Sequence, residues 1–360
     1  MMIMAIDHAS AFIARQHAAE FWAGAMSAYT NWFPFLTRAV THLCAPGFFF
    51  LMGAGVYWYA ASTGNAVGRT VKRGFVLFVL AQLVEVPIML LQGILPPAKV
   101  NLNVVTAPPP NDGTALYWGF ITLSGLGLVL MVCGMLLKLR PWMWLAVSAL
   151  CVVATNSLLP ASGKPGAWWM ALLLAPGLAQ HIIAVYPVIP WLAGAAAGMY
   201  FAYWWRGDPD NARKWVWVIG LVLIGFGLAL RAAGGWGNIR LPRDGSWIEF
   251  FNNVKYPPSL VFWCLSLGTD LLLLGLLVRL PEWVKSKRSP LIVFGQTPLF
   301  FYIAHFWLFT GLAFLLFREP TTLGNMYWVW GAGLVGLYPV CAWYRDFKLS
   351  KERESWWRMF

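Results

Sequence analysis

Residues 39–61 read AVTHLCAPGFFFLMGAGVYWYAA, a run of 23 residues that contains no Asp, Glu, Lys or Arg. A helix needs about 20 predominantly apolar residues to cross the hydrocarbon core of a bilayer. The run therefore predicts a membrane-spanning helix, and similar runs recur along the chain. They predict an all-α fold, a polytopic membrane bundle of about ten transmembrane helices. The predicted spans are 1–14, 39–61, 74–95, 115–137, 141–158, 184–205, 215–233, 258–279, 291–317 and 326–344. The apolar stretch 167–178 is shorter, and we expect an interfacial or re-entrant piece there.

The composition excludes most other classes of protein. Of the 360 residues, 59% are hydrophobic and only 11% are charged, and the mean hydropathy is +0.63. Soluble domains are usually about 25% charged, and disordered chains are poorer in apolar residues. The apolar runs are too long and continuous for an outer-membrane barrel. The five cysteines lie in or beside apolar runs without a CxxC pair, so we interpret them as packing residues and predict no metal site.

The positive charge follows the connections between spans. The net charge is +12, and 17 of the 26 Lys and Arg fall after even-numbered spans or in the tail 345–360. This alternation is a topology signal and does not indicate nucleic-acid binding. It predicts both termini in the cytoplasm and one membrane domain over 1–360, with 345–360 as a basic cytoplasmic tail. The first span covers only about 21 Å, so we expect either a true start upstream of Met1 or a truncated helix.

Titratable side chains inside predicted spans need a reason, because burying a charge in a bilayer is costly. Among them are Asp7, His8, His42, Glu85, Asp270 and His305. The two carboxylates of Glu85 and Asp270 fit structural pairing inside the bundle or a functional role. The histidines are candidates for acid, base or acyl-acceptor chemistry near neutral pH.

Two clusters lie at the predicted outer face. In the first, Arg38, Thr41 and His42 open the second span, with Arg38 and His42 on one helical face. In the second, Lys255 and Tyr256 precede two prolines that suit a helix start, where free N–H groups attract anions. Lys255 could bind a phosphate, carboxylate or oxyanion there, or it could be a snorkelling lysine.

Three further positions carry weaker signals. Asp7 and His8 are neighbours in sequence and do not share a helical face, so they need not form one dyad, and either could contact a different helix. His17 and His181 lie in predicted outer segments, and we interpret both as ordinary surface histidines.

Five segments resemble the bacterial branch of the heparan-alpha-glucosaminide N-acetyltransferase-like membrane family. They are MAIDH at 4–8, LTRAVTHLCAPGFFFLMGAG at 36–55, YPVIPWLAG at 186–194, NNVKYPPSLVFWCLSLG at 252–268 and PLIVFGQTPLFFYIAHFW at 290–307. They follow the family order and extend over most of the chain. The resemblance implies a multi-pass protein of the bacterial plasma membrane.

The resemblance also implies a reaction. The animal enzyme moves an acetyl group from cytosolic acetyl-CoA to the amine of a terminal glucosamine across the membrane, and an essential histidine lies near the non-cytosolic end of its first helices. His17 lies in about the corresponding loop, but Ala18-Ala19-Glu20 follows it where the animal enzyme has Trp-Asn-Gly. The family's Asp-x-x-Arg-Gly-like stretch before the first helix is also missing. We therefore assign the role to His42, in the best-matched segment.

The sequence thus predicts a membrane acyltransferase that uses acetyl-CoA or another acyl-CoA as donor and a sugar or glycan acceptor. His42 is the expected base or acyl acceptor, with Asp7 and His8 as its partners and His305 as a further candidate. Arg38, Thr41, Lys255 and Tyr256 are the expected substrate-binding residues, and no metal is required. Basic loop residues either bind the CoA phosphates or only set topology. The candidates for binding the CoA phosphates are Arg69, Lys72, Arg73, Arg213, Lys214, Lys285, Lys287 and Arg288.

Two rival functions fit the same composition. A proton-coupled transporter or permease could use Asp7, Glu85, Asp270 and His305 as a relay, although we find no internal repeat. A non-catalytic envelope scaffold has less need of buried titratable groups. The sequence leaves the oligomeric state open, a homo-oligomer included.

Overall fold

The computed structural model describes residues 1–360 except 19, 25, 30, 89–117, 181, 353–354 and 360. Most of the described chain is helical. The helices are α1 (Met2–Ala9), α2 (Trp32–Thr41), α3 (Cys44–Ala60), α4 (Ala66–Leu80), α6 (Thr122–Leu136), α7 (Pro141–Ser157), α8 (Trp168–Leu173), α9 (Val188–Gly207), α10 (Pro209–Ala233), α11 (Trp247–Phe251), α12 (Leu260–Val278), α13 (Pro290–Gln296), α14 (Pro298–Leu315) and α15 (Leu323–Leu349). Shorter π or 3₁₀ turns are η1 (Ser10–Ala14), η2 (Ala81–Glu85) and η3 (Trp356–Met359).

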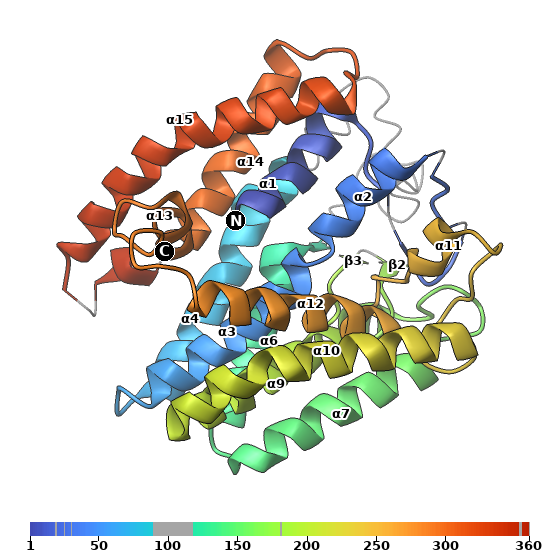
Figure 1. Ribbon diagram of the computed structural model, residues 1–360, viewed down its shortest axis with the longest axis horizontal. Coiled ribbons are helices and arrows are strands. Elements are labelled where there is room, and N and C mark those ends of the chain that lie inside the picture. Colours follow the sequence, from blue (N-terminus) through green and yellow to red (C-terminus); the bar gives the residue numbers. More distant parts are fainter. Residues whose placement is uncertain are drawn as a thin grey trace.

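Two apolar cores divide the bundle. One joins α1 and η1 to α14 and α15, which lie together in the upper part of Figure 1. The other joins α3, α6, α7 and α9, and it includes Phe21 and Tyr256 from two connecting segments. Helix α1 belongs to the first core and α3 to the second. Helix α2 and the segment that carries Phe21 connect the two helices along the chain.

Three helix pairs touch backbone to backbone through glycines. A Cβ on Gly53 of α3 would lie 1.9 Å from the carbonyl oxygen of Ala195 in α9, and one on Gly198 would lie 1.9 Å from that of Phe50. Small residues such as Gly53 and Gly198 allow such close approach of membrane helices. The pairs Gly74–Gly127 and Gly220–Gly268 join α4 to α6 and α10 to α12 in the same way.

The prediction of a purely helical fold needs one correction. Strands β1 (Trp118–Phe120), β2 (Gly177–Ala179) and β3 (Ile182–Ala184) form a small sheet in the order β1-β3-β2. Strand β3 is parallel to β1, pairing Ile182 with Trp118, and antiparallel to β2. The predicted span 115–137 includes β1, so its helix begins only at Thr122. Stretch 167–178 contains the short helix α8 and the start of β2.

Several helix ends differ from the predicted bounds. The predicted span 291–317 is two helices, because Pro298 lacks the N–H needed to continue α13 and the chain turns at Thr297. Helix α2 starts at Trp32, seven residues before the predicted bound, where the Asn31 side chain accepts a hydrogen bond from Phe33 N. Helices α4 and α10 also start earlier than predicted, and α15 extends five residues into the predicted tail. The end of the predicted span 74–95 lies outside the described residues.

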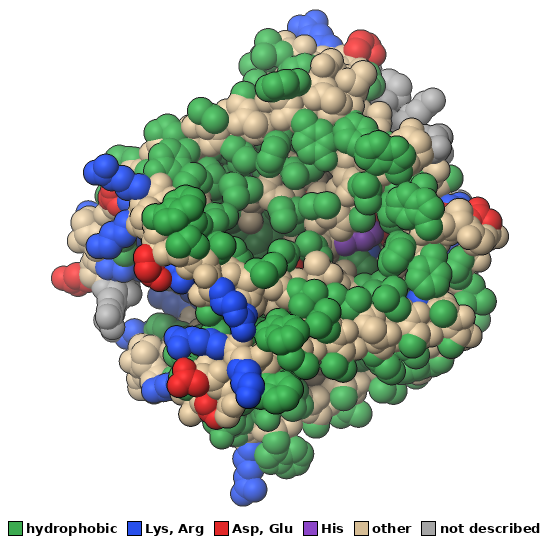
Figure 2. Space-filling view, in the orientation of Figure 1, with side chains coloured by type: hydrophobic (Ala, Val, Ile, Leu, Met, Phe, Trp, Pro, Cys, Tyr) green, Lys and Arg blue, Asp and Glu red, His purple; other side chains and the backbone are tan. Residues whose placement is uncertain are grey.

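The outer surface suits a membrane. Four helical stretches are long and apolar enough to cross one, namely Trp32–Ala60, Pro209–Ala233, Leu260–Val278 and Pro298–Leu315. Met2–Ala14, Thr122–Leu136 and Pro141–Ser157 are shorter apolar helices. Figure 2 shows apolar side chains over most of one face, with Lys and Arg gathered toward the left end and a hollow near the centre in which a histidine is visible. A total of about ten spans stays a prediction.

Candidate active site

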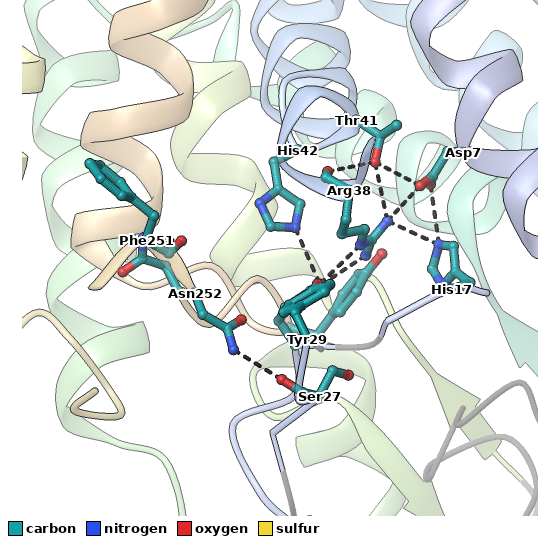
Figure 3. Close-up of polar contacts among 12 residues, drawn as sticks. Asp7, His17, Ser27, Tyr29, Arg38, Thr41, His42, Phe251 and Asn252 are labelled. Carbon is teal, nitrogen blue, oxygen red and sulfur yellow. Dashed lines mark hydrogen bonds and ion pairs between the residues drawn. The ribbon is translucent and has the colours of Figure 1, made fainter. Parts of the chain in front are cut away.

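A buried arginine organises the polar centre of the molecule. Arg38 of α2, only 5% exposed, donates from Nε and Nη2 to the two carboxylate oxygens of Glu20, at 2.9 and 2.8 Å. Its Nη1 donates to Asp7 Oδ1 at 2.6 Å and lies 3.4 Å from Thr41 Oγ1. Figure 3 shows the guanidinium at the centre of these contacts. Because most of its donors have partners within the protein, Arg38 acts here as a structural node, which weakens its predicted role in binding substrate.

Glu20 is the main residue that the sequence analysis missed. It lies in an irregular segment and is completely buried. Its Oε1 also accepts a hydrogen bond from Tyr29 at 3.1 Å and lies 3.3 Å from His42 Nε2. Burial alone would raise the pKa of Glu20, but Arg38 and His42 hold that pKa well below its ordinary value. A buried arginine in an apolar helix requires an acidic partner. In the sequence, Arg38 was therefore the signal for a buried carboxylate such as Glu20.

His42 lies at the turn between α2 and α3, next to Glu20. Its Nε2 is buried and is not aligned for a hydrogen bond with any described residue, although Glu20 is 3.3 Å away. In Figure 3 the other ring nitrogen points away from Glu20. A carboxylate therefore lies beside one nitrogen of the imidazole, and the second nitrogen makes no hydrogen bond with any described residue.

His17 was wrongly interpreted as a surface residue. Its Nε2 lies 3.3 Å from Asp7 Oδ2 and 2.9 Å from Arg38 Nη1. Burial and the neighbouring guanidinium lower the pKa of His17, so the ring is neutral near pH 7 and Nε2 accepts from Arg38. Thr41 completes this side of the cluster by donating to Asp7 Oδ1 at 2.7 Å.

His8 and Asp7 contact different elements. Asp7 faces Arg38, whereas His8 Nδ1 lies 2.6 Å from Nε2 of His305 on α14. The second nitrogen of His305 lies 2.7 Å from the carbonyl oxygen of Phe301. His305 is fully buried. The structure therefore joins two predicted residues in a pair, and His8 lies close enough to Asp7, Arg38 and Lys255 to interact electrostatically with them.

Lys255 is buried and does not snorkel to the surface. The residue is 2% exposed, and its ammonium lies 5.1 Å from the ring centre of Tyr256. It makes no hydrogen bond or ion pair with any described side chain, and it is close enough to interact electrostatically with Asp7, His8 and His42. This positive charge therefore belongs to the interior of the site.

A helix starts directly after the prolines, but its first N–H groups are not free for an anion. Helix α12 begins at Leu260, and its first N–H groups already have partners, since Leu260 N donates to Asn156 Oδ1 and Phe262 N to Ser259 Oγ. Instead, the backbone N–H groups of Lys255 and Tyr256 both donate to the carbonyl oxygen of Glu20 at 3.0 Å. This joins the Lys255 segment to the segment that carries Glu20.

A second ion pair, between Arg243 and Glu249, holds the segment around Met26 and Ser27 in place. Arg243 donates to the Met26 and Ser27 carbonyls at 3.1 Å, and Asn252 Nδ2 donates to the Ser27 carbonyl at 3.1 Å. Glu249 accepts hydrogen bonds from both Arg243 and Asn252. The Arg243 guanidinium lowers the pKa of Glu249 to about 2.

The two remaining carboxylates have different surroundings. Glu85 is fully buried and accepts hydrogen bonds from Tyr302 and from the backbone N–H groups of Thr122 and Leu123 at the start of α6. These contacts fit the structural interpretation of Glu85. Asp270 of α12 faces Gly47 of α3, and its Oδ2 has no hydrogen-bond partner among the described residues. Neither joins the Arg38 cluster. His181 lies outside the described residues.

Comparison with known families identifies one family for this chain. Residues 18–226, more than half of the chain, match the family model of the heparan-alpha-glucosaminide N-acetyltransferase catalytic domain. The chain belongs to this family. It is a membrane protein of the acyltransferase class. No curated protein matches the chain closely enough for comparison. The matched region contains Glu20, Arg38 and His42, whereas His8, Lys255 and His305 lie outside it.

Proposed function

We propose that this protein transfers an acyl group, acetyl in the simplest case, from acyl-CoA to an amine or hydroxyl of a sugar-containing acceptor across the bacterial plasma membrane. The observation that carries the proposal is the imidazole of His42 beside the buried carboxylate of Glu20, with the unpaired ammonium of Lys255 in the same interior. Family membership supports the transferase class.

His42 is the proposed general base. Glu20 stabilises the ring with an N–H on Nε2, which leaves Nδ1 unprotonated and able to take a proton from the acceptor. The loose alignment of Nε2 with Glu20 is compatible with this role, because catalytic hydrogen bonds often tighten only in the complex with substrate. Arg38 keeps Glu20 ionised and in place, so we assign it to positioning.

Lys255 is the proposed oxyanion-stabilising group. Attack on the thioester places a negative charge on the carbonyl oxygen, and a preorganised ammonium in a water-poor site stabilises that charge strongly. Lys255 is suited to this because no described side chain neutralises its charge by direct contact. Thr41 and Tyr256 border the same interior and are the proposed acceptor-binding residues.

The acyl-CoA donor is proposed to enter from the basic end of the bundle, which we assign to the cytoplasm together with both termini. A surface cavity of about 480 Å³ at the α9–α10 junction there is lined by Tyr57, Tyr203, Trp204, Arg206, Gly207 and Asp208. Aromatic rings and a guanidinium suit an adenine ring and a phosphate. The basic loop residues named above supply further positive charge at the ends of the predicted spans.

The transporter alternative has less support. A proton relay through Asp7, Glu85, Asp270 and His305 requires these groups to approach one another. Asp7 is bound to Arg38, and Glu85 is bound to Tyr302 and the start of α6. Uptake of labelled solute into proteoliposomes is the test of that alternative.

The deciding experiment follows radiolabelled acetyl-CoA and free CoA with purified protein and glucosamine. We expect acceptor-dependent CoA release that His42→Ala abolishes. If there is no turnover, and acetyl-CoA produces no thermal shift, the proposal is wrong and the chain shares only its fold and family with the acetyltransferases.

A further inference from the structure

His8 and His305 form a chain of hydrogen bonds with a fixed direction. His305 Nδ1 lies 2.7 Å from the carbonyl oxygen of Phe301, and a carbonyl can only accept. His305 Nδ1 therefore carries a proton. The Nε2 of the same ring lies 2.6 Å from His8 Nδ1, so the two nitrogens share one proton between them.

The surroundings of His305 decide where that proton lies. The ring is fully buried and packs against aromatic side chains, with centroid distances of 5.0 Å to Phe301 and 6.1 Å to Phe309. An apolar setting of this kind favours an uncharged imidazole. A neutral His305 that is protonated on Nδ1 has a bare Nε2, which must accept from His8 Nδ1.

We infer that His305 is a positioning residue that holds His8 in the tautomer protonated on Nδ1, so that His8 presents an unprotonated Nε2 as a second proton acceptor of the site. The hydrogen bond that the His8 ring makes with a described residue uses Nδ1, so Nε2 is not engaged by it. The free neutral imidazole of histidine prefers the opposite tautomer, so the pairing with His305 changes which nitrogen can act.

The inference rests on the proposed function and assigns acceptors to the protons that the acyl transfer releases. An amine acceptor arrives as an ammonium and loses two protons as it becomes an amide. One N–H bond breaks before attack on the thioester and the other breaks after it, while the C–S bond cleaves. One proton ends on the CoA sulfur and the other leaves to solvent. His42 and His8 together supply two neutral acceptors for these steps, and no electrons are exchanged with a third reagent.

The tautomer of His8 is measured by ¹⁵N NMR of the full chain, labelled on its histidine rings and held in nanodiscs. The chain has only five histidines, so the His8 signals are assigned by their loss in His8→Gln. We expect Nδ1 to resonate as a protonated nitrogen and Nε2 as an unprotonated one. A protonated Nε2 in the unaltered protein overturns the inference, whether or not the protein turns over acyl-CoA.

Three variants then test the positioning role. His305→Gln keeps an acceptor oxygen near the place of Nε2, whereas His305→Leu removes it, and Phe309→Leu alters the neighbouring packing alone. We expect His305→Leu to reverse the His8 tautomer and to lower kcat about 100-fold with little change in KM for acyl-CoA. His305→Gln should restore most of kcat, and Phe309→Leu should leave the tautomer unchanged. Equal losses in His305→Gln and His305→Leu would overturn the inference. Absence of turnover in the unaltered protein contradicts the proposed function and leaves the tautomer result to decide the positioning role.

Discussion

The Glu20 carboxylate and the Arg38 guanidinium face each other in a two-point pair, with donor–acceptor distances of 2.9 and 2.8 Å. Glu20 comes from an irregular segment and Arg38 from α2. Paired in this way, each charge compensates the burial of the other. Since Glu20 also faces His42, the pair connects the stability of the fold to the proposed base.

Removing the Glu20 charge should therefore destabilise the protein strongly. Glu20→Gln leaves Arg38 with only one carboxylate partner, Asp7, and breaking a buried pair costs about 3–5 kcal/mol. Thermal unfolding in detergent, followed by cysteine accessibility, measures the loss. Tyr29→Phe is the matched control, because it removes one hydrogen bond to the same carboxylate and should cost only about 1 kcal/mol. Equal effects of the two variants would contradict the central role of the ion pair.

His42 and His17 can be separated by their effects on turnover. If His42 is the base, His42→Ala should lower kcat by about 10²–10⁴-fold, while His17→Ala should have a smaller effect through Asp7. Initial rates of CoA release at saturating acetyl-CoA measure both. A larger loss in His17→Ala would transfer the role to His17.

Lys255 should matter for chemistry more than for folding. Lys255→Met keeps the length of the side chain and removes its charge, so we expect a fall in kcat of about 10²-fold or more from the loss of oxyanion stabilisation. Melting temperature should stay the same or rise, because an unpaired buried charge is removed. A large loss of Tm with unchanged kcat would show that the ammonium is structural.

The Glu249–Arg243 pair predicts a pH dependence of stability. The folded protein lowers the pKa of Glu249 from about 4.5 to about 2, so the unfolded chain binds the proton more tightly. The pair therefore stabilises the fold above pH 4.5, and this contribution is lost as pH falls toward 2. Glu249→Gln should lower Tm at pH 7 by about 2–5 °C, and the difference should shrink below pH 4.5. Glu282→Gln is the control, since its pair with Lys285 is exposed and such pairs contribute little.

The close contact of α3 with α9 predicts a sharp contrast between two neighbouring glycines. Gly53→Ala would place a Cβ 1.9 Å from the carbonyl oxygen of Ala195, whereas Gly55→Ala meets no atom within 4 Å. Gly53→Ala should cost about 3 kcal/mol or more through forced separation of the helices. Gly55→Ala should be neutral or slightly stabilising. Similar melting temperatures for the two variants would mean that the helices are not packed this closely.

The helices were largely predictable because apolar runs of sufficient length have few other uses. The predicted and observed bounds differ where one apolar run contains two different elements of secondary structure. Trp118–Phe120 is as apolar as the helix that follows it, and hydropathy alone cannot distinguish a strand there. The break at Thr297 was marked by Pro298, and the early start of α10 by the cap Asp208 and by Pro209. Both are local signals, and the predicted bounds followed the hydropathy pattern instead.

The candidate site was predictable only in part. Asp7, Arg38, Thr41 and His42 stood out because polar groups are unusual in apolar helices. Glu20 and His17 did not, because they lie in an irregular segment where a polar residue is ordinary and no periodicity indicates a direction. Their burial depends on contacts with residues far away in sequence, such as the Glu20 carbonyl with Lys255 N.

The glycine contacts of α3 with α9, α4 with α6 and α10 with α12 also constrain how the protein can move. Where two backbones touch directly, no side chain can change rotamer to absorb a displacement. Each pair is thus a rigid two-helix strut, and bending one member carries the other with it. If the proposed acyl-CoA donor enters between helices, whole pairs must slide or tilt against α1, α14 and α15. The space within a pair cannot widen.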